Sequence, residues 1–150
     1  MAPSPPTVSE AVLAREVQRL LEDLALQRPG QRSLVAGECI PPVDVLASPQ
    51  AVQVVVDVPG VCLEALRIAI VQDVVIIVGE KYRTAPTRTP VSAHLIERDF
   101  GRFVRVVPLP AAVDASRARA TLARGELRVT VPTLTDLRGR VYPVPIERGA

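Results

Sequence analysis

The side chains that most often carry out catalysis are few in this chain and stand apart from one another. His94 is the only histidine, so no pair of histidines can bind a metal, and any nucleophilic triad would depend on that one residue. Four carboxylates lie beside predicted turns and arginines, where solvated or ion-paired roles are more common than acid and base catalysis. They are Asp57, Glu80, Glu97 and Asp99. The sequence therefore predicts a protein that is not an enzyme and binds no metal.

The cysteines and the glycine pattern point the same way. Cys39 and Cys62 are too few and too widely spaced to build a disulfide framework or a metal site, and we expect both to be reduced thiols. A phosphate-binding loop of the GxxxxGK[ST] type is absent from the sequence. No cofactor is therefore expected.

The composition favours one β-rich domain. A chain of 150 residues that is 48% hydrophobic has room for one domain with a real core and short flanking segments. Because aromatic residues make up only 3%, the core must be built from Val, Leu, Ile and Ala, and the valine-rich segments favour β-sheet. The net charge of +2 comes from dispersed arginines and acids, so the footprint of a nucleic-acid-binding protein is missing.

The sequence also lacks the features of membrane and exported proteins. Residues 1–6 do not combine a basic region with an apolar run, and no stretch of about 18 apolar residues occurs. We expect a soluble, cytoplasmic protein.

An amphipathic helix is predicted at about residues 8–27. Thr7 and Glu10 have the spacing of a capping box, and Pro29-Gly30 ends the pattern. Apolar residues recur at helical intervals on one face: Val8, Val12, Leu13, Val17, Leu20, Leu21 and Leu24. Two interpretations remain open, a helix packed on its own domain and a helix whose apolar stripe needs another chain. The opposite face mixes both charges, so a membrane-surface helix is not indicated.

Strand patterns dominate the middle of the chain. They lie at residues 43–46, 51–58, 66–70, 74–78, 103–107, 118–122 and 127–131. Turn residues predict two hairpins, one around Gln72-Asp73 and one around Arg124-Gly125. Val74–Val78 is apolar on both faces, which predicts burial by a second sheet on one side and by another segment on the other.

The segment 103–107 is the strand that the others need as a partner, and we expect it to end near Val107 because Pro108 and Pro110 follow. The connection before it, residues 81–99, is long for a passive loop. Within it, residues 93–97 have the composition of a short strand. We therefore expect an arm that leaves its own domain.

Taken in order, these segments resemble the α-crystallin domain of small heat-shock proteins of the bacterial type. The resemblance covers about residues 42–146 and depends on the order and spacing of several motifs. They are Asp57-Val58-Pro59-Gly60, Val75-x-Ile77-x-Gly79-Glu80, Glu97-Arg98-x-Phe100-Gly101-x-Phe103-x-Arg105, Leu109-Pro110, Ala120, Gly125-x-Leu127 and Val131-Pro132. The resemblance implies an all-β, immunoglobulin-like β-sandwich. It divides the chain into an N-terminal arm with the helix (1–41), an α-crystallin domain (42–132) and a flexible C-terminal extension (133–150).

The resemblance also implies two kinds of assembly contact. A dimer would form when the strand near Leu95 and Ile96 joins the partner's edge strand, which holds Val43, Val45 and Leu46, with Arg105 pairing across the interface. Higher assembly would follow from docking of the tail motif Val144-Pro145-Ile146 into a groove between two strands. The groove residues carried over by position are Leu66, Ile68, Ile70, Ala118, Ala120 and Leu122.

The residues of the tail motif support docking on physical grounds. Pro145 biases Val144 towards an extended conformation, so Val144 and Ile146 project to the same side. A tail that is self-docked or disordered is the alternative interpretation. Several positions depart from the family pattern: Val75, Val144 and Ala118 are smaller than the usual residues, and Thr133 stands in place of the common Lys. Because Ala118 and Val144 would leave one pocket underfilled, we expect weakened or dynamic docking.

The function implied by the resemblance is that of an ATP-independent chaperone in the stress response, a holdase that binds partly unfolded proteins. Its partners would be further copies of itself and unfolded clients, without nucleic acid, membrane or small-molecule substrate. Client and assembly contacts are expected from the helix residues Val12, Leu13, Val17, Leu20, Leu21 and Leu24. The N-terminal arm lacks the Phe-rich segments common in the family. The alternative is a β-sandwich adaptor that binds one specific protein partner.

Overall fold

The computed structural model describes residues 8–26, 39–83, 91–134, 143–146 and 148. They form one α-helix, seven strands and two short 3-10 helices. The bounds are α1 (Glu10–Leu26), β1 (Val43–Ala47), β2 (Ala51–Asp57), η1 (Leu63–Ala65), β3 (Leu66–Val71), β4 (Val74–Lys81), β5 (Gly101–Pro108), η2 (Ala115–Arg117), β6 (Arg119–Ala123) and β7 (Glu126–Pro132). No helix in these ranges is long and apolar enough to cross a membrane.

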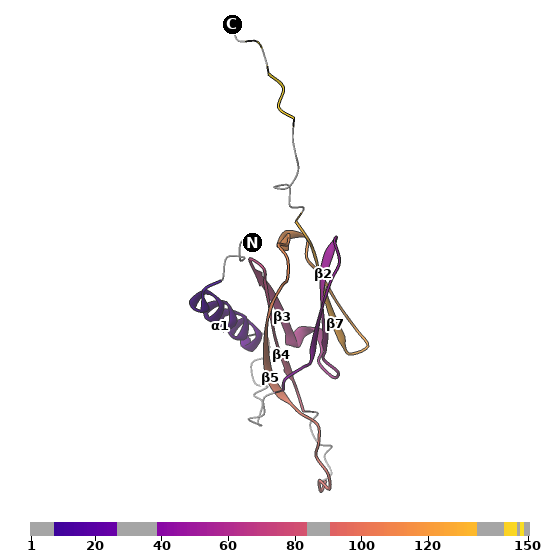
Figure 1. Cartoon of the computed structure of the whole chain (residues 1–150). Coiled ribbons are helices and arrows are strands. Elements are labelled where there is room, and N and C mark those ends of the chain that lie inside the picture. The colour runs from indigo at the N-terminus through magenta and orange to yellow at the C-terminus, as the bar shows by residue number, and fades with distance from the viewer. Residues whose placement is uncertain (1–7, 27–38, 84–90, 135–142, 147, 149–150) are drawn as a thin grey trace.

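The strands build two antiparallel sheets that face each other (Figure 1). One sheet has the order β1-β2-β7-β6 and the other has the order β3-β4-β5. Alternate residues of the strands point into the space between them, and β2 shows this as strict alternation of buried and half-buried positions. The core contains Val52, Val54, Val56, Val75, Ile77, Phe103, Leu127, Val129 and Val131. The predicted all-β sandwich is confirmed.

Both predicted hairpins form at two-residue turns. Leu122 pairs with Leu127 and Ala123 pairs with Glu126, which leaves Arg124 and Gly125 as the turn between β6 and β7. Their φ angles are 54° and 74°, the positive values that a type I′ turn requires. The second turn, Gln72-Asp73, joins β3 to β4 with Val71 paired to Val74.

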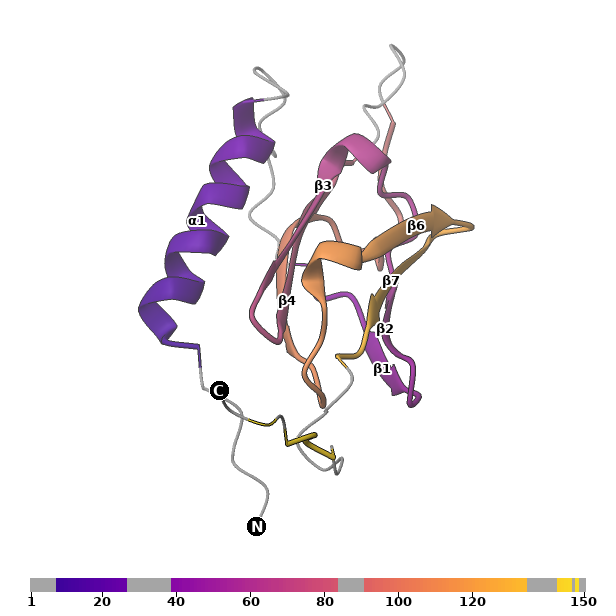
Figure 2. The same ribbon diagram turned by 90° about the horizontal axis from the view of Figure 1, so that it is seen from above.

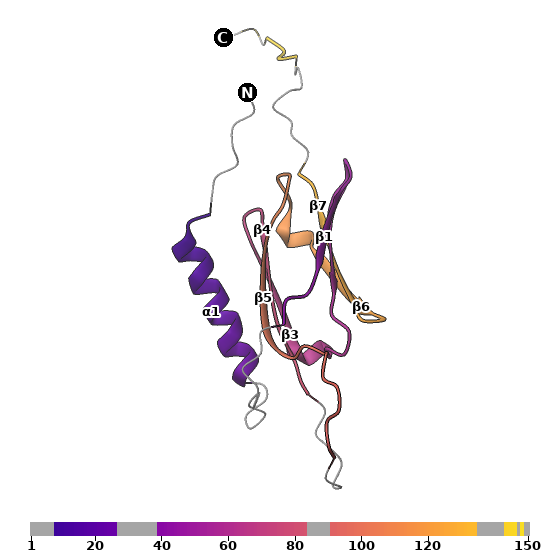
Figure 3. The ribbon, with the colours of Figure 1, turned by 60° about the horizontal axis from the view of Figure 1, so that its bottom comes forward.

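Strand β4 is buried on both faces, as its sequence predicts. Val75 and Ile77 point into the sandwich core, whereas Val74, Ile76 and Val78 belong to a second apolar cluster on the far side of the sheet. Helix α1 covers part of that far side. Figure 3 shows α1 against the β3-β4-β5 sheet, with the other sheet on the opposite side.

The helix packs on its own domain, which settles the choice between the two interpretations within a single chain. Leu20 and Leu24 are buried, and Leu13, Val17 and Leu21 pack beside the buried cluster. The predicted start was wrong in one respect, because Ser9 and not Thr7 precedes the first helical turn. Ser9 accepts hydrogen bonds from the backbone N–H groups of Val12 and Leu13, and its hydroxyl lies 3.3 Å from the nitrogen of Val12. Thr7 itself lies outside the described residues.

Strand β5 ends one residue later than expected, at Pro108. A proline is tolerated there because, within the described part of the chain, β5 pairs with β4 alone and Pro108 is its last residue. Residues 91–100, which include the expected short strand at 93–97, contain no strand in the single chain. An extended segment without a neighbouring strand has nothing to complete its ladder of hydrogen bonds.

Candidate functional site

A groove opens between β3 and β6, the edge strands of the two sheets. Two adjacent pockets form it, with volumes of about 300 Å³ and 190 Å³. Ile68 and Ala120 line both pockets, so the two are continuous along one line. We call this feature the β3–β6 groove.

All six residues predicted from the sequence to form a tail-binding groove line these pockets. Ile70 and Ala118 belong to the larger pocket, and Leu66 and Leu122 belong to the smaller one, with Ile68 and Ala120 shared. The β3 residues alternate with outward-facing ones and pair with inward-facing positions of β4. The β3–β6 groove is therefore lined mainly by apolar side chains at a two-residue spacing.

The tail motif is not covered by its own domain. Val144 is 82% exposed and Ile146 is 98% exposed. The side chains of the motif therefore stand free in the single chain, separate from the groove that the sequence analysis assigned to them.

The residues predicted for a dimer interface lie in three places. Val43, Val45 and Leu46 lie on β1, which pairs with β2 alone among the described strands. The side chains of Val45 and Leu46 are exposed, and Val43 packs partly against the core. Leu95 and Ile96 are exposed in the segment before β5, which projects from one end of the sandwich (Figure 1). Arg105 is half-buried on β5 and pairs with Ile77.

A cluster of cations surrounds Phe100 where that segment returns to the sandwich. The buried ring has Lys81 Nζ at 5.5 Å, Arg83 Cζ at 4.7 Å and Arg98 Cζ at 4.8 Å from its centroid. Such contacts favour a cation over the face of an aromatic ring. The sequence analysis did not predict this cluster, because the ring brings together residues from both ends of a long connection.

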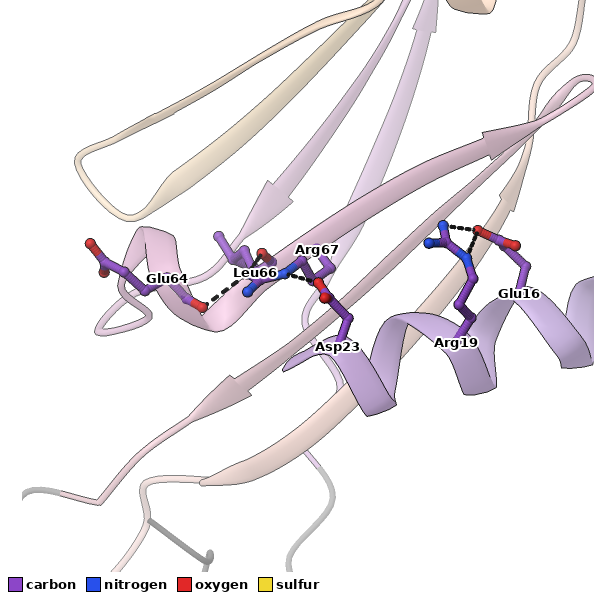
Figure 4. A network of polar contacts seen from close by, with 6 residues as sticks. All are labelled: Glu16, Arg19, Asp23, Glu64, Leu66 and Arg67. Atoms are coloured by element: carbon purple, nitrogen blue, oxygen red, sulfur yellow. Dashed lines mark hydrogen bonds and ion pairs between the residues drawn. The ribbon is translucent and has the colours of Figure 1, made fainter. Parts of the chain in front are cut away.

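Helix α1 is tied to β3 by an ion pair that the sequence did not indicate. Arg67 Nε lies 2.8 Å from Asp23 Oδ2, and Arg67 Nη1 donates to the carbonyl oxygens of Glu64 and Leu66 at 3.0 Å and 2.6 Å (Figure 4). A separate pair lies on the helix itself, where hydrogen bonds from Arg19 hold the pKa of the Glu16 carboxyl below its usual range. Arg67 and Asp23 therefore link α1 to β3 through one ion pair.

The structure shows the surroundings of three of the candidate chemical residues. Glu80 is 4% exposed, and its carboxylate lies 3.7 Å from Arg102 Nε, which is an ion-paired role. Cys39 and Cys62 are both half-buried. Within the ranges that the structure describes, no three His, Cys, Asp or Glu side chains gather as metal ligands would. The arrangement is suited to binding proteins through apolar surfaces.

Comparisons with known proteins agree with this architecture. A model of the "Hsp20/alpha crystallin family" matches residues 44–146. Heat shock protein 16 of Schizosaccharomyces pombe is 31% identical over 129 residues, which cover 85% of this chain and 84% of that protein. The 26.7 kDa chloroplastic heat shock protein of Oryza sativa subsp. japonica is 30% identical over 135 residues, which cover 87% of this chain but only 56% of that longer relative.

A solved structure supports the fold independently. Heat shock protein 16.0 from Schizosaccharomyces pombe aligns with a TM-score of 0.60 at 28% sequence identity. The alignment covers 73% of this chain and 99% of that chain. The sandwich described above is therefore the fold of these proteins.

Proposed function

Because the chain belongs to the Hsp20/alpha crystallin family, we propose that it is an ATP-independent chaperone, a holdase that binds partly unfolded proteins under stress and suppresses their aggregation. The task requires apolar surface that can be exposed while it is held in an assembly. We propose that the protein acts as a holdase in the cytoplasm, without an enzymatic step and without a nucleic-acid partner.

The observation that supports this proposal most directly is the match between an exposed motif and an apolar groove. Val144 and Ile146 stand exposed two residues apart, and the β3–β6 groove offers two joined pockets. Pro145 lacks an N–H group, so docking would use the backbone of the residues on either side of it. We propose that the motif of one copy docks into the groove of another, which links subunits and masks an apolar surface until the tail exchanges.

The dimer that the resemblance implies would be the building block of the larger assembly. The open edge of β1 presents unpaired backbone groups, which a further strand can satisfy. We propose that the segment around Leu95 and Ile96 of a second copy adds to this edge and acquires there the strand structure that it lacks in the single chain. The domain at 42–132 would then be the rigid unit, between an arm at 1–41 and an extension at 133–150.

Light scattering from a heat-destabilised client enzyme, without ATP and at increasing ratios of this protein, tests the proposal. Suppression near stoichiometric amounts is the expected result. A folded protein that leaves client aggregation unchanged would overturn the holdase function and favour an adaptor that binds one specific partner. The size of the assembly gives a second test, since an adaptor is expected to remain a monomer or dimer.

A further inference from the structure

The side of the β3-β4-β5 sheet that faces away from the core is apolar. We call it the outer face and define it by Ala69, Val71, Val74, Ile76 and Val78. The pairing of Ala69 with Ile76 and of Val71 with Val74 puts these side chains side by side on two strands. A sheet face that looked onto water would carry polar residues at these positions. The outer face is therefore built to be covered.

Helix α1 covers only part of this surface. The helix contacts β3 and β4, as the view in Figure 2 also shows. On β5, Val104 pairs with Val78 and Val106 pairs with Ile76, so both continue the outer face. Val104 is 40% exposed and Val106 is 41% exposed. The apolar surface thus extends past the helix, where an incoming segment can make first contact.

Arg67 lies at one edge of the outer face, and its charge selects what can lie there. The ion pair of Glu80 with Arg102 lies farther along the same side of the sheet. Arg67 pairs with Asp23 of the helix, and its Nη2 is buried without a hydrogen-bond partner among the described residues. An arginine side chain keeps its charge under all ordinary conditions and only donates hydrogen bonds. A segment that replaced α1 would therefore need its own carboxylate opposite Arg67 to avoid leaving this guanidinium without its acid.

We propose that the outer face is a client-binding site and that α1 occupies it until a client displaces the helix. The occupant it fits has the chemistry of α1 itself: an amphipathic client segment with apolar residues at helical spacing and a carboxylate that meets Arg67. Few of the helix side chains are fully buried, chiefly Leu20 and Leu24, so the helix can be exchanged without opening the sandwich core. This inference rests on the proposed holdase function and assigns it a surface.

The test uses the full chain with a photo-cross-linking amino acid at position 104, beside the helix. Asp23→Lys places a second cation against Arg67 and should release α1. Glu22→Lys is the matched control, because it makes the same charge change at an exposed neighbour that bonds only to Gln18 of the helix in the described contacts. The rate of amide hydrogen exchange over residues 10–26 shows whether α1 is released from the sheet. We expect Asp23→Lys to raise both helix exchange and client cross-linking severalfold, with Glu22→Lys close to the unaltered sequence.

A second variant keeps the test decisive if the charge change leaves the helix in place. Leu20→Ser combined with Leu24→Ser removes the buried anchors of α1 without touching the sandwich, and the same cross-linking rise is expected. A synthetic peptide of residues 8–28 should compete with the client in this variant, whereas the same peptide with Asp23→Lys should not. A released helix with unchanged cross-linking to client, or cross-links only to a second copy, would overturn the inference. Failure of the unaltered chain to suppress aggregation would instead overturn the proposed function.

Discussion

Arg67 on β3 and Asp23 on α1 form an ion pair with 2.8 Å between Nε and Oδ2, across 44 residues of sequence. The pair joins two parts of the chain that otherwise meet through apolar side chains. Arg67 is largely buried and Asp23 is half-exposed, so the two ends of the pair lie in different environments. Solvent therefore screens the pair only in part, and its contribution is expected to be modest.

A double-mutant cycle with Asp23→Ala and Arg67→Ala measures that contribution. We expect a coupling free energy of about 0.5–1 kcal/mol, which shrinks at high salt because one partner is exposed. Urea unfolding of the two single variants and the double variant provides the values. Arg67→Ala should cost more than Asp23→Ala, since Arg67 also donates to the carbonyl oxygens of Glu64 and Leu66. A coupling of zero at low salt would show that the pair does not hold the helix.

Gly79 leaves no room for a side chain, and this predicts a destabilised Gly79→Ala variant. A Cβ atom there would lie 2.3 Å from Phe103 Cζ and 2.9 Å from the carbonyl oxygen of Ala65. Overpacking of this kind costs about 1–3 kcal/mol, so we expect about 2 kcal/mol of lost stability by thermal or urea unfolding. Phe103→Leu removes the nearest atom. The double variant should therefore lose less than the sum of the two single losses, and strict additivity would contradict the steric explanation.

The strands were predictable because their cause is local. The alternating valines predict β2, and Arg124-Gly125 predicts a two-residue turn, each from a pattern of only a few neighbouring residues. The run Val74–Val78 even indicated that a further segment must cover the sheet. The sequence also predicted all six residues that line the β3–β6 groove, five on β3 and β6 and Ala118 just before β6, although most of that prediction came through the resemblance.

The features that escaped prediction depend on contacts between distant segments. The helix pattern shows an apolar stripe but not what lies beneath it, so the pairing of Asp23 with Arg67 could not be deduced. The cations around Phe100 come from both ends of the long connection between β4 and β5. The sequence does not predict that these two ends lie close together. The helix start was misplaced by a choice between Thr7 and Ser9, two residues of similar capping propensity that lie close together.

Removal of the tail motif is expected to reduce the size of the assembly. In Val144→Gly with Ile146→Gly, both exposed apolar side chains are lost while the domain is left unchanged. The particle mass from multiangle light scattering should fall to that of a dimer. Arg148→Gly serves as the control, because it shortens a side chain just outside the motif, and it should keep the full mass. An unchanged mass in the motif variant would mean that the tail does not link subunits.

Filling the pocket at Ala118, which we expect to be underfilled, should strengthen the docking of the tail. Ala118→Ile adds three carbon atoms to the larger pocket of the β3–β6 groove, where each newly buried methylene contributes about 0.8 kcal/mol. Subunit exchange between labelled assemblies should therefore become at least tenfold slower. Ala123→Ile makes the same change at the exposed last residue of β6 and should leave exchange unaltered. Assemblies of Ala118→Ile that exchange no more slowly would contradict an underfilled pocket.

The open edge of β1 predicts that a charge there disrupts the dimer. Leu46 and Leu134 are both 55% exposed, so Leu46→Lys and Leu134→Lys differ in location but not in burial. Natural sheets use such lysines to prevent a further strand from pairing with an edge. In a chain that also lacks the tail motif, sedimentation velocity should show a dimer dissociation constant raised at least tenfold by Leu46→Lys, equivalent to about 1.4 kcal/mol, and unchanged by Leu134→Lys. Equal dimerisation of the two variants would place the interface elsewhere, because the two leucines are equally exposed and Leu46 is the one that lies on β1.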